Sequence, residues 1–586
     1  MREVPYGLAT MRNVQISVLV EQAYNNHILM NRCRYFAVFF ICLLGSGNLL
    51  AQSVSLFTPL LEDFARRKQL SGDISDSYSF MVRPFVASKE LGFDSLFNQL
   101  INKNTIASDE KLKVEPLPVI FRVQHNSGYS FGQNNGVMVP NRGAQTVLSG
   151  GFYMSYGKFS FQFQPEFLTA QNKPYRGMPS GSGRNWRDYY EYLNRIDLPE
   201  RFGLGTVINP YLGNSSIRFT LDNGLSMGIS NEYLWWGPSK RNSLMMSNNA
   251  SGFLHVTVNT QKPIETKIGN FEGQFLIGRL QNSGFPPPNS TLEIRKTLLY
   301  APKRDLDWRY LAGVIFTYQP AWIPGLSLGY SSTSQIYHND MDRFGDYLPI
   351  FNGRKNFTYL VDPVINRRQQ QSAGFFRWIS VKGKLEFYGE YGTNGNSKTF
   401  REFIVNPDLY RAFTLGFVKL MPLSRPEQFI QVTGEITQTG QTVRKAITDI
   451  SSWYTHSHVR HGYTHRGQNL GYGYGSGSNS AFLEVSWVNE FSRIGMQMER
   501  VANNNDSFYL QFEHIDGWDR YWIDIVPSMV LDRKFGQLLL STRFQYVNTL
   551  NYYWVLERNP NAPLYRLQPG DDRKNFVTHI SLGYLF

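Results

Sequence analysis

The last eleven residues of this 586-residue chain constrain its fold most strongly, and they read Phe-Val-Thr-His-Ile-Ser-Leu-Gly-Tyr-Leu-Phe. In an extended strand, small or polar side chains alternate here with apolar ones, which fall at Ile580, Leu582, Tyr584 and Phe586. One apolar face, one small or polar face and a terminal aromatic ring are typical of the closing strand of an outer-membrane β-barrel. Because a soluble β-protein can end in the same way, the rest of the chain must decide between the two.

The same period of two recurs along the chain. Glu386, Glu435, Glu484, Glu499 and Arg543 each alternate with apolar neighbours. In a membrane barrel these charges must face the interior, because a charge on the lipid side costs roughly 2–4 kcal/mol at mid-depth. Only 18% of the residues are charged and 15% are aromatic, as expected for a wall with a lipid-facing side. We therefore predict an all-β fold, a large antiparallel transmembrane β-barrel spanning residues 116–586.

The N-terminal region predicts export. Arg32 and Arg34 precede a short apolar run that ends in small residues and Leu49-Leu50-Ala51-Gln52, so residues 1–52 are interpreted as a signal peptide. Met30 directly precedes this signal, and we interpret residues 1–29 as a mis-assigned start. Both cysteines lie inside the signal, which leaves the mature chain without a disulfide or a thiol nucleophile.

The charge of the chain predicts anionic partners. The formal net charge is +13, and removal of residues 1–52 leaves about +11, because four basic and two acidic residues are lost. Such a surface favours lipopolysaccharide phosphates, other outer-membrane lipid or acidic polysaccharide. Export argues against nucleic acid. We also expect the barrel-assembly machinery to recognise the C-terminal strand.

The connections alternate between short turns and long loops, which a soluble β-sandwich has no reason to do. Short turns are predicted around Gly157, 222–224, 262–263, 381–384, 489–491, 516–519 and 548–551. Long loops, which we expect to face outward, are predicted at 170–214, 281–307, 334–369, 393–411, 438–479 and 557–575. This pattern gives about twenty strands.

Residues 53–115 differ from the barrel pattern. Thr58 and Pro59 are typical of a helix start, and Leu60, Leu61 and Phe64 share one helical face. A second helical pattern runs through 88–102. We predict a small periplasmic helical domain, and a partly ordered linker is the alternative.

One motif carries a family resemblance. Trp-Trp-Gly-Pro at 235–238 and Ser-Asn-Asn-Ala at 247–250, with Leu244 and Met245 between them, resemble the Wzi family of capsule-assembly outer-membrane proteins. The resemblance implies a barrel of about 18 strands, inward-folded loops that block the pore, and a lectin-like role in holding capsular polysaccharide. It does not imply catalysis or a cofactor. The predicted count of twenty strands departs from this pattern, and an over-counted hairpin within 118–156 would explain the difference.

The motif has groups that suit a sugar. Indole faces pack against sugar rings, amides and hydroxyls bind sugar hydroxyls, and basic side chains pair with uronic-acid carboxylates. The candidate polysaccharide-binding residues are Trp235, Trp236, Lys240, Arg241, Ser247, Asn248, Asn249, Trp453 and Tyr454. In the alternative interpretation this loop folds into the barrel and its tryptophans pack there.

Two further patterns are weaker. The 438–479 loop contains four histidines, His456, His458, His461 and His465. They could bind a transition metal, although no carboxylate or cysteine completes the set. The inner glutamates could be mistaken for catalytic pairs, but pairing with Arg493, Arg543 and other inner cations explains them better. No nucleophile motif is present. The sequence therefore favours a non-catalytic polysaccharide-binding barrel, with a diffusion porin as the alternative.

Overall fold

The computed structural model describes residues 59–75, 77–84, 112–178, 184–221, 223–348, 367–394, 400–405, 411–441, 452–512, 521–555 and 570–586. The predicted signal peptide, the second helical pattern at 88–102 and the predicted turn at 516–519 lie outside these ranges. None of the described helices is long and apolar enough to cross a membrane.

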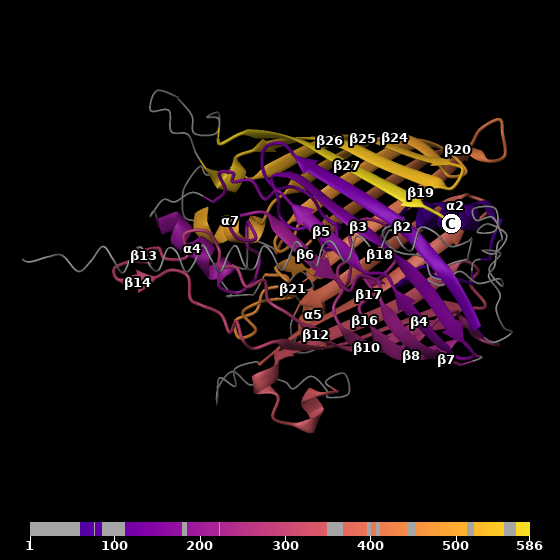
Figure 1. The fold of residues 1–586 in the computed structure, drawn as a ribbon, viewed down its shortest axis with the longest axis horizontal. Coiled ribbons are helices and arrows are strands. Elements are labelled where there is room, and N and C mark those ends of the chain that lie inside the picture. The colour runs from indigo at the N-terminus through magenta and orange to yellow at the C-terminus, as the bar shows by residue number, and fades with distance from the viewer. Residues whose placement is uncertain are drawn as a thin grey trace, which may run out of the picture. The chain divides into compact units, whose positions relative to one another are not determined.

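The strands form one closed antiparallel barrel (Figure 1). Each strand pairs with its neighbour in the chain, and β27 closes the cylinder by pairing with both β26 and β2. Three of the strands are interrupted, because β4 continues into β5, β6 into β7 and β10 into β11. Counting each of these as one gives the eighteen strands of the described barrel. The count of twenty was therefore wrong. The 118–156 region holds parts of two genuine strands, β2 and β3, so the excess did not arise there.

The barrel strands and the helices have the following bounds. The first half of the wall comprises β2 Leu112–Asn126, β3 Gly143–Tyr156, β4 Phe159–Phe163, β5 Glu166–Ala170, β6 Val207–Tyr211, β7 Ser216–Thr220, β8 Leu225–Ser230, β10 His255–Thr260, β11 Ile264–Thr266, β12 Gly269–Leu280 and β15 Arg309–Pro320. The second half comprises β16 Leu326–Tyr337, β17 Arg368–Ser380, β18 Leu385–Asn394, β19 Arg411–Pro422, β20 Gln428–Gln438, β23 Asn479–Asn489, β24 Ser492–Ala502, β25 Ile523–Phe535, β26 Leu538–Leu550 and β27 Arg573–Tyr584. The α-helices are α2 Pro59–Ser71, α4 Arg184–Leu193, α5 Phe400–Val405 and α7 Asn505–Phe512.

The remaining elements are short. Three pairs of two-residue strands form small sheets: β1 Val82–Arg83 with β9 Trp235–Trp236, β13 Glu293–Ile294 with β14 Thr297–Leu298, and β21 Thr464–His465 with β22 Gln468–Asn469. Single 3₁₀ turns occur at η2 His338–Asp340, η3 Phe344–Asp346 and η4 Tyr552–Trp554.

The outer surface of the wall is apolar. Large hydrophobic side chains are exposed all round the barrel, including Phe121, Met227, Val256, Phe316, Leu328, Phe387, Leu415, Ile436, Leu483, Met496, Met529, Phe544 and Phe576. A continuous apolar belt of this kind is untenable in water, and closure of the ladder pairs the strand edges that lipid could not satisfy, apart from one side of β6 near the long-loop end. The wall therefore crosses a membrane, and the predicted inward positions of Glu386, Glu435, Glu484 and Glu499 are confirmed by their burial.

The two ends of the barrel differ as expected. Short turns join β3 to β4, β7 to β8, β11 to β12, β15 to β16, β17 to β18, β19 to β20, β23 to β24 and β25 to β26, and longer connections join the strands at the other end. The turns predicted at Gly157, 222–224, 381–384 and 489–491 are confirmed. Those at 262–263 and 548–551 were wrong, because the first is the interruption between β10 and β11 and the second lies where β26 meets a long loop. Proline and asparagine at these places mimic turn signals.

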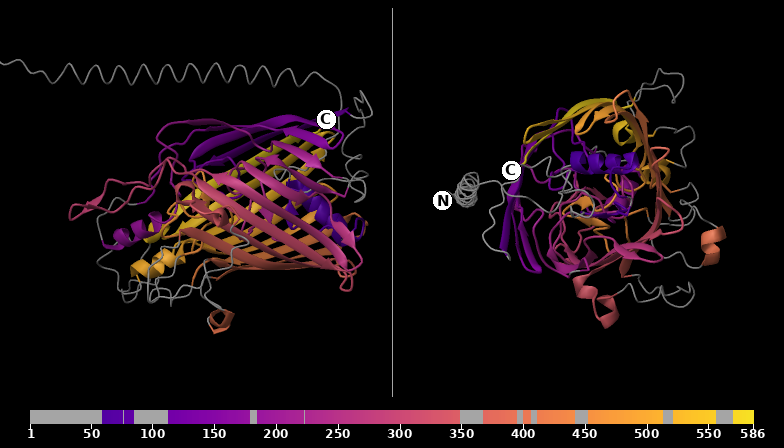
Figure 2. Two further views of the ribbon diagram at one scale, coloured as in Figure 1. Left: turned by 90° about the horizontal axis from the view of Figure 1, so that it is seen from below. Right: turned by 90° about the vertical axis from the view of Figure 1, so that its right-hand side faces the viewer.

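Three segments of the described chain pack together in the interior, and we call them the plug: residues 59–75 with 77–84, the loop between β8 and β10, and the 452–478 loop. Helix α2 was correctly predicted as a helix, but it lies within the ring of strands and not in a separate domain below the barrel (Figure 2). Its apolar face packs against Phe491, Leu539 and Leu585 at the short-turn end. The extent of the proposed 53–115 domain stays a prediction, because 85–111 is outside the described residues.

The plug has a hydrophobic core inside the barrel, and glycines in the wall let its large rings approach. The core contains Trp236, Trp453 and Tyr454 together with inward-facing wall residues. A Cβ atom on Gly313 of β15 would lie 2.7 Å from the Trp236 ring, and one on Gly392 of β18 would lie 2.9 Å from the Trp453 ring. The two tryptophans therefore rest directly on wall backbone.

We expect Gly313→Ala to destabilise the folded protein by about 1–3 kcal/mol, because the added methyl group overpacks the Trp236 site. The measurement is the urea midpoint of the purified protein in detergent, followed by gel migration of unheated samples. Gly374→Ala is the matched control, because no atom lies within 4 Å of the Cβ it would add. An equal midpoint for the two variants would contradict this account of Trp236.

Candidate functional site

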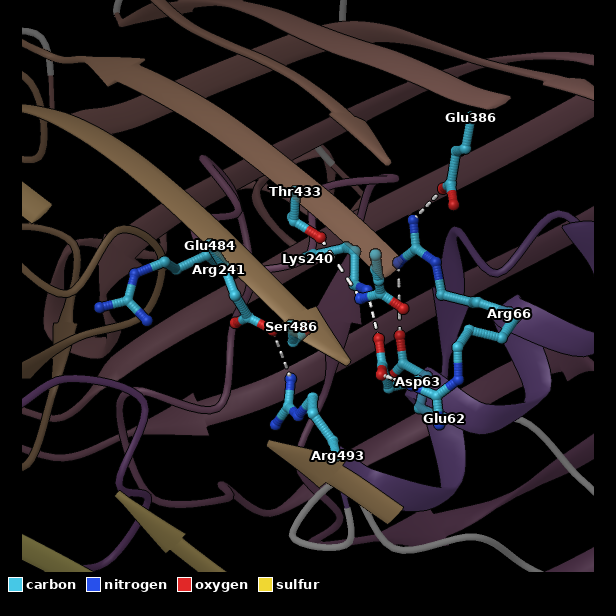
Figure 3. Close-up of polar contacts among 12 residues, drawn as sticks. Glu62, Asp63, Arg66, Lys240, Arg241, Glu386, Thr433, Glu484, Ser486 and Arg493 are labelled. Carbon is cyan, nitrogen blue, oxygen red and sulfur yellow. Dashed lines mark hydrogen bonds and ion pairs between the residues drawn. The ribbon is translucent and has the colours of Figure 1, made fainter. Parts of the chain in front are cut away.

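Helix α2 is held in the lumen by buried ion pairs (Figure 3). Arg66 pairs with Glu386 of β18, and the Arg377 Nε of β17 donates to the same carboxylate at 2.7 Å. Arg66 also donates to the carbonyl of Pro238 in the Trp-Trp-Gly-Pro motif at 2.8 Å. One inward carboxylate thus joins the helix, the wall and the motif loop.

A second set of charges links α2 directly to the motif. Lys240 and Arg67 both pair with Asp63 of the helix. Burial alone would raise the pKa of Asp63, but these two cations outweigh it and hold the pKa below its usual range. Arg83 of β1 donates to the carbonyls of Gly237 and Ser239 at 2.7 and 3.0 Å. The motif loop and the N-terminal segment therefore form one unit.

The inner glutamates of the wall hold the backbone of the motif loop. Glu390 accepts hydrogen bonds from the N–H groups of Ser239 and Leu244 at 3.3 and 3.0 Å. Glu435 accepts from those of Lys240 and Arg241 at 3.0 and 3.1 Å. Such charge-assisted bonds fix a loop that otherwise leaves buried N–H groups unpaired.

Arginine pairs account for other inner acids. The Arg241 guanidinium makes a two-point contact with Glu499, with its Nε at 3.0 Å. Arg493 bridges Glu484 at 3.2 Å and Asp532 at 2.6 Å. Pairing with Arg493 is thus confirmed as predicted. Arg543, predicted to pair in the same way, has no ion pair with a described carboxylate.

Five of the nine predicted site residues are part of the plug packing. Trp236, Trp453 and Tyr454 are at most 1% exposed in its core. The hydroxyl of Ser247 donates to the Gly471 carbonyl at 2.6 Å, and the amide of Asn249 donates to the Asn469 carbonyl at 3.0 Å. These contacts join the motif loop to the 452–478 loop. They agree with the alternative interpretation, in which the motif loop folds into the barrel and packs there.

The other four predicted residues meet at a cavity, which we call the luminal chamber. Trp235, Lys240, Arg241 and Asn248 all line it, and its volume is about 290 Å³. Its remaining walls come from α2, from Arg83 of β1, from the 133–138 part of the loop after β2, and from the inner faces of β2, β20 and β23–β27. The chamber therefore lies between the motif loop and one side of the barrel.

The chamber lining contains several buried polar atoms that have no partner among the described residues. They are Arg83 Nε, Trp235 Nε1, Gln133 Nε2 and Oε1, Asn248 Oδ1, Gln431 Oε1, Glu435 Oε1, Gln497 Oε1, Arg543 Nε and His579 Nε2. Buried polar groups are normally satisfied, so a cluster of this kind offers partners to ordered water or to the polar groups of a ligand. Both donors and acceptors are available, and Arg543 adds a guanidinium that has no ion pair with a described carboxylate.

A second cavity adjoins the chamber towards the long loops. Gln133, Asn135 and Met138 line both cavities. The second cavity has a volume of about 160 Å³ and is lined by long-loop residues that include Leu198, Pro199 and Gln468. The luminal chamber thus neighbours the loop-bearing end of the barrel through Gln133.

The four loop histidines are each engaged by protein groups. The closest contacts are His458 Nε2 to Asp340 at 2.6 Å and His461 Nδ1 to the Tyr337 hydroxyl at 2.7 Å. His456 and His465 accept backbone N–H bonds. Burial lowers the pKa of His456 to about 4 and that of His461 to about 2, so both rings are neutral at neutral pH. Within the described ranges, no three His, Cys, Asp or Glu side chains form a group that could hold a metal ion.

The comparisons with known proteins agree with this architecture. The profile of a family described as capsule assembly protein Wzi matches residues 122–519. No curated protein sequence matches. Wzi of Escherichia coli has the same fold, and its structure is described as an outer-membrane carbohydrate-binding β-barrel involved in group 1 capsule assembly. The two chains are 14% identical with a TM-score of 0.55, and the match covers 92% of this chain and 100% of the Escherichia coli protein. A BenF-like porin from Pseudomonas fluorescens (8% identity, TM-score 0.36, coverage 81% and 99%) and OccAB4 of Acinetobacter baumannii (6%, 0.36, 82% and 99%) are more distant.

We expect Glu386→Gln to release α2, because Arg66 and Arg377 lose a shared buried partner at a cost of about 3–5 kcal/mol. Trypsin should then cleave the folded protein after residues 66–68, and gel migration of unheated samples reports whether the barrel itself persists. Asp73→Asn is the control, because its pair with Lys68 is largely exposed and stabilises by about 0–1 kcal/mol. If the folded Glu386→Gln protein resists trypsin as well as the wild type does, the Arg66–Glu386–Arg377 contacts do not hold α2 in place.

Proposed function

The chain belongs to the Wzi family of capsule assembly proteins, and on this premise we propose that it binds acidic surface polysaccharide without covalent chemistry. Binding of this lectin-like kind anchors the polymer at the cell surface or helps to assemble it there. The proposed location is the outer membrane of a Gram-negative cell, with the short-turn end and the N-terminal segment on the periplasmic side. This orientation places the long loops where surface polysaccharide lies.

The observation that carries the proposal is the lining of the luminal chamber. An indole offers two flat faces for the C–H side of a sugar ring, and Trp235 is the chamber's indole, with the Arg83 guanidinium 4.7 Å from its ring centre on one face. The free amide atoms of Gln133, Asn248 and Gln497 suit sugar hydroxyls, which both donate and accept. Arg543 supplies a guanidinium for a uronate carboxylate. Few other ligand classes need all three kinds of group together.

The neighbouring cavity supports entry from the outside. It extends from Gln133 towards loop residues Pro199 and Gln468. Because the two cavities share three lining residues, a sugar unit bound beside Trp235 would be close to polymer lying among the outer loops. The chamber then holds one unit of a longer chain.

The engagement of the acids supports a non-catalytic role. Glu386, Glu390, Glu435, Glu484 and Glu499 each hold an arginine, a backbone N–H group or both. Glu435 and Glu484 also line the luminal chamber, but Glu484 is paired with Arg493, and one oxygen of Glu435 accepts from the Tyr388 hydroxyl and two backbone N–H groups. A general acid or nucleophile needs a carboxylate that is free to reach its substrate. We also propose that the C-terminal strand is the signal read by barrel-assembly machinery, since β27 ends the wall at its closing seam.

We expect Trp235→Phe combined with Arg543→Gln to weaken binding of an acidic capsular oligosaccharide about tenfold or more, because both the indole platform and the cation are lost. Isothermal titration with the folded protein measures this, and capsule retention on intact cells should fall in parallel. The control, Trp322→Phe, changes an exposed tryptophan in the short turn between β15 and β16, which does not line the chamber. Unchanged affinity in the folded double variant would remove the chamber from the binding site.

The diffusion-porin alternative makes a separate prediction. The plug joins α2, the motif loop and the 452–478 loop by buried ion pairs and hydrogen bonds, so the protein in a planar bilayer should pass little current. Steady open-channel conductance comparable to that of a general porin would favour the alternative. Single-channel recording decides between the two.

A further inference from the structure

The barrel wall has a seam near its long-loop end. β6 pairs with β5 on one side, and no described strand pairs with its other side. β8 ends at Ser230 and β10 begins only at His255, because the loop between them has folded inward as part of the plug. At the long-loop end, the pairing of β12 with β10 stops at Gly278 and His255. The last two residues of β12, Arg279 and Leu280, therefore extend past the start of β10.

A groove occupies this seam, and we call it the rim groove. Its volume is about 470 Å³, and its walls include Tyr211 of β6, Arg279 of β12, and Phe285 and Trp308 of the following loop. Arg466 reaches it from the plug, where its Nε donates to the side chain of Gln281 at 2.9 Å. The groove thus combines aromatic rings with two guanidinium groups.

Both guanidinium groups lack a carboxylate partner among the described residues. The Arg279 guanidinium lies 5.2 Å from the centre of the Trp308 ring, and that of Arg466 lies 5.0 Å from the centre of the Tyr211 ring. The single acid in the lining, Asp305, has a side chain that is 66% exposed and mainly faces water. The rim groove therefore has an excess of positive charge.

The position of Arg279 places the groove at the membrane surface. Leu276 and Leu280 are fully buried on the inner side of β12, so Arg279 is on the lipid-facing side. A charge on that side is tolerated only near the interface, where tryptophan rings also gather. Exposed Ile208, Leu212 and Leu254 flank the seam with apolar surface.

From this combination we propose that the rim groove binds the phosphate group of an anionic glycolipid in the outer leaflet. The two arginines hold the phosphate, the aromatic rings cover the sugar headgroup, and the flanking apolar side chains pack against acyl chains. This site is separate from the luminal chamber and does not depend on polysaccharide binding there.

The test is native mass spectrometry of the folded protein in detergent micelles that contain bisphosphorylated lipid A. We expect Arg279→Gln combined with Arg466→Gln to weaken the apparent affinity about tenfold. Dephosphorylated lipid A should bind the wild type as weakly as the intact lipid binds the double variant. The matched control is Arg533→Gln, because Arg533 is also exposed on a strand and lies 5.2 Å from the Phe535 ring, but at the short-turn end.

Each outcome bears on the proposal. Wild-type affinity in the folded double variant, or an equal loss with Arg533→Gln, overturns it. If millimolar inorganic phosphate displaces lipid A from the wild type, the groove binds a free anion and the lipid proposal fails. Competition by soluble acidic polysaccharide would assign it to glycan. Loss of lipid A binding alone, with oligosaccharide affinity of the double variant unchanged, supports the lipid site and separates it from the chamber.

Discussion

The compensation of buried carboxylates inside the barrel is the interaction on which the rest of the structure depends. A closed wall turns Glu386, Glu390 and Glu435 inward, and uncompensated charges there would cost several kcal/mol each. Their partners are not mainly in neighbouring strands. Arg66 of α2 and the backbone of the motif loop supply them. Without the plug, these wall carboxylates would be buried and uncompensated. Without the wall, the plug would lose the partners of its arginine and backbone N–H groups.

This dependence explains why the Trp-Trp-Gly-Pro motif has two roles. Trp236 rests on Gly313 and fixes the loop in the hydrophobic core, while the adjacent Trp235 faces the luminal chamber. Adjacent residues of an extended segment point in opposite directions, so Trp236 can pack in the core while Trp235 lines the chamber beside Arg83. The folding of this loop into the lumen also leaves the wall open beside β6, and the rim groove is the result.

Most of the architecture could be predicted from the sequence because strand periodicity is local. The C-terminal pattern identified β27, and the alternation around Glu386, Glu435, Glu484 and Glu499 gave the inward face correctly. The strand count failed where a local signal was ambiguous, as at Lys262-Pro263, which interrupts a strand without ending it. Gln133 and the unpaired state of Arg543 had no local signal. Arg279 had one: it occupies a lipid-facing position in the alternation of β12.

The sequence by itself determined the barrel, the inward and outward faces of its strands, the helical start at Pro59 and the family. These follow from residue order over a few positions, because a strand or a helix end is fixed by its nearest neighbours. Only the tertiary structure decided which motif residues pack and which line the chamber, and that Arg543 remains without a carboxylate. Those outcomes depend on contacts between residues such as Asp63 and Lys240, which lie far apart in the chain and meet only when the wall closes around them.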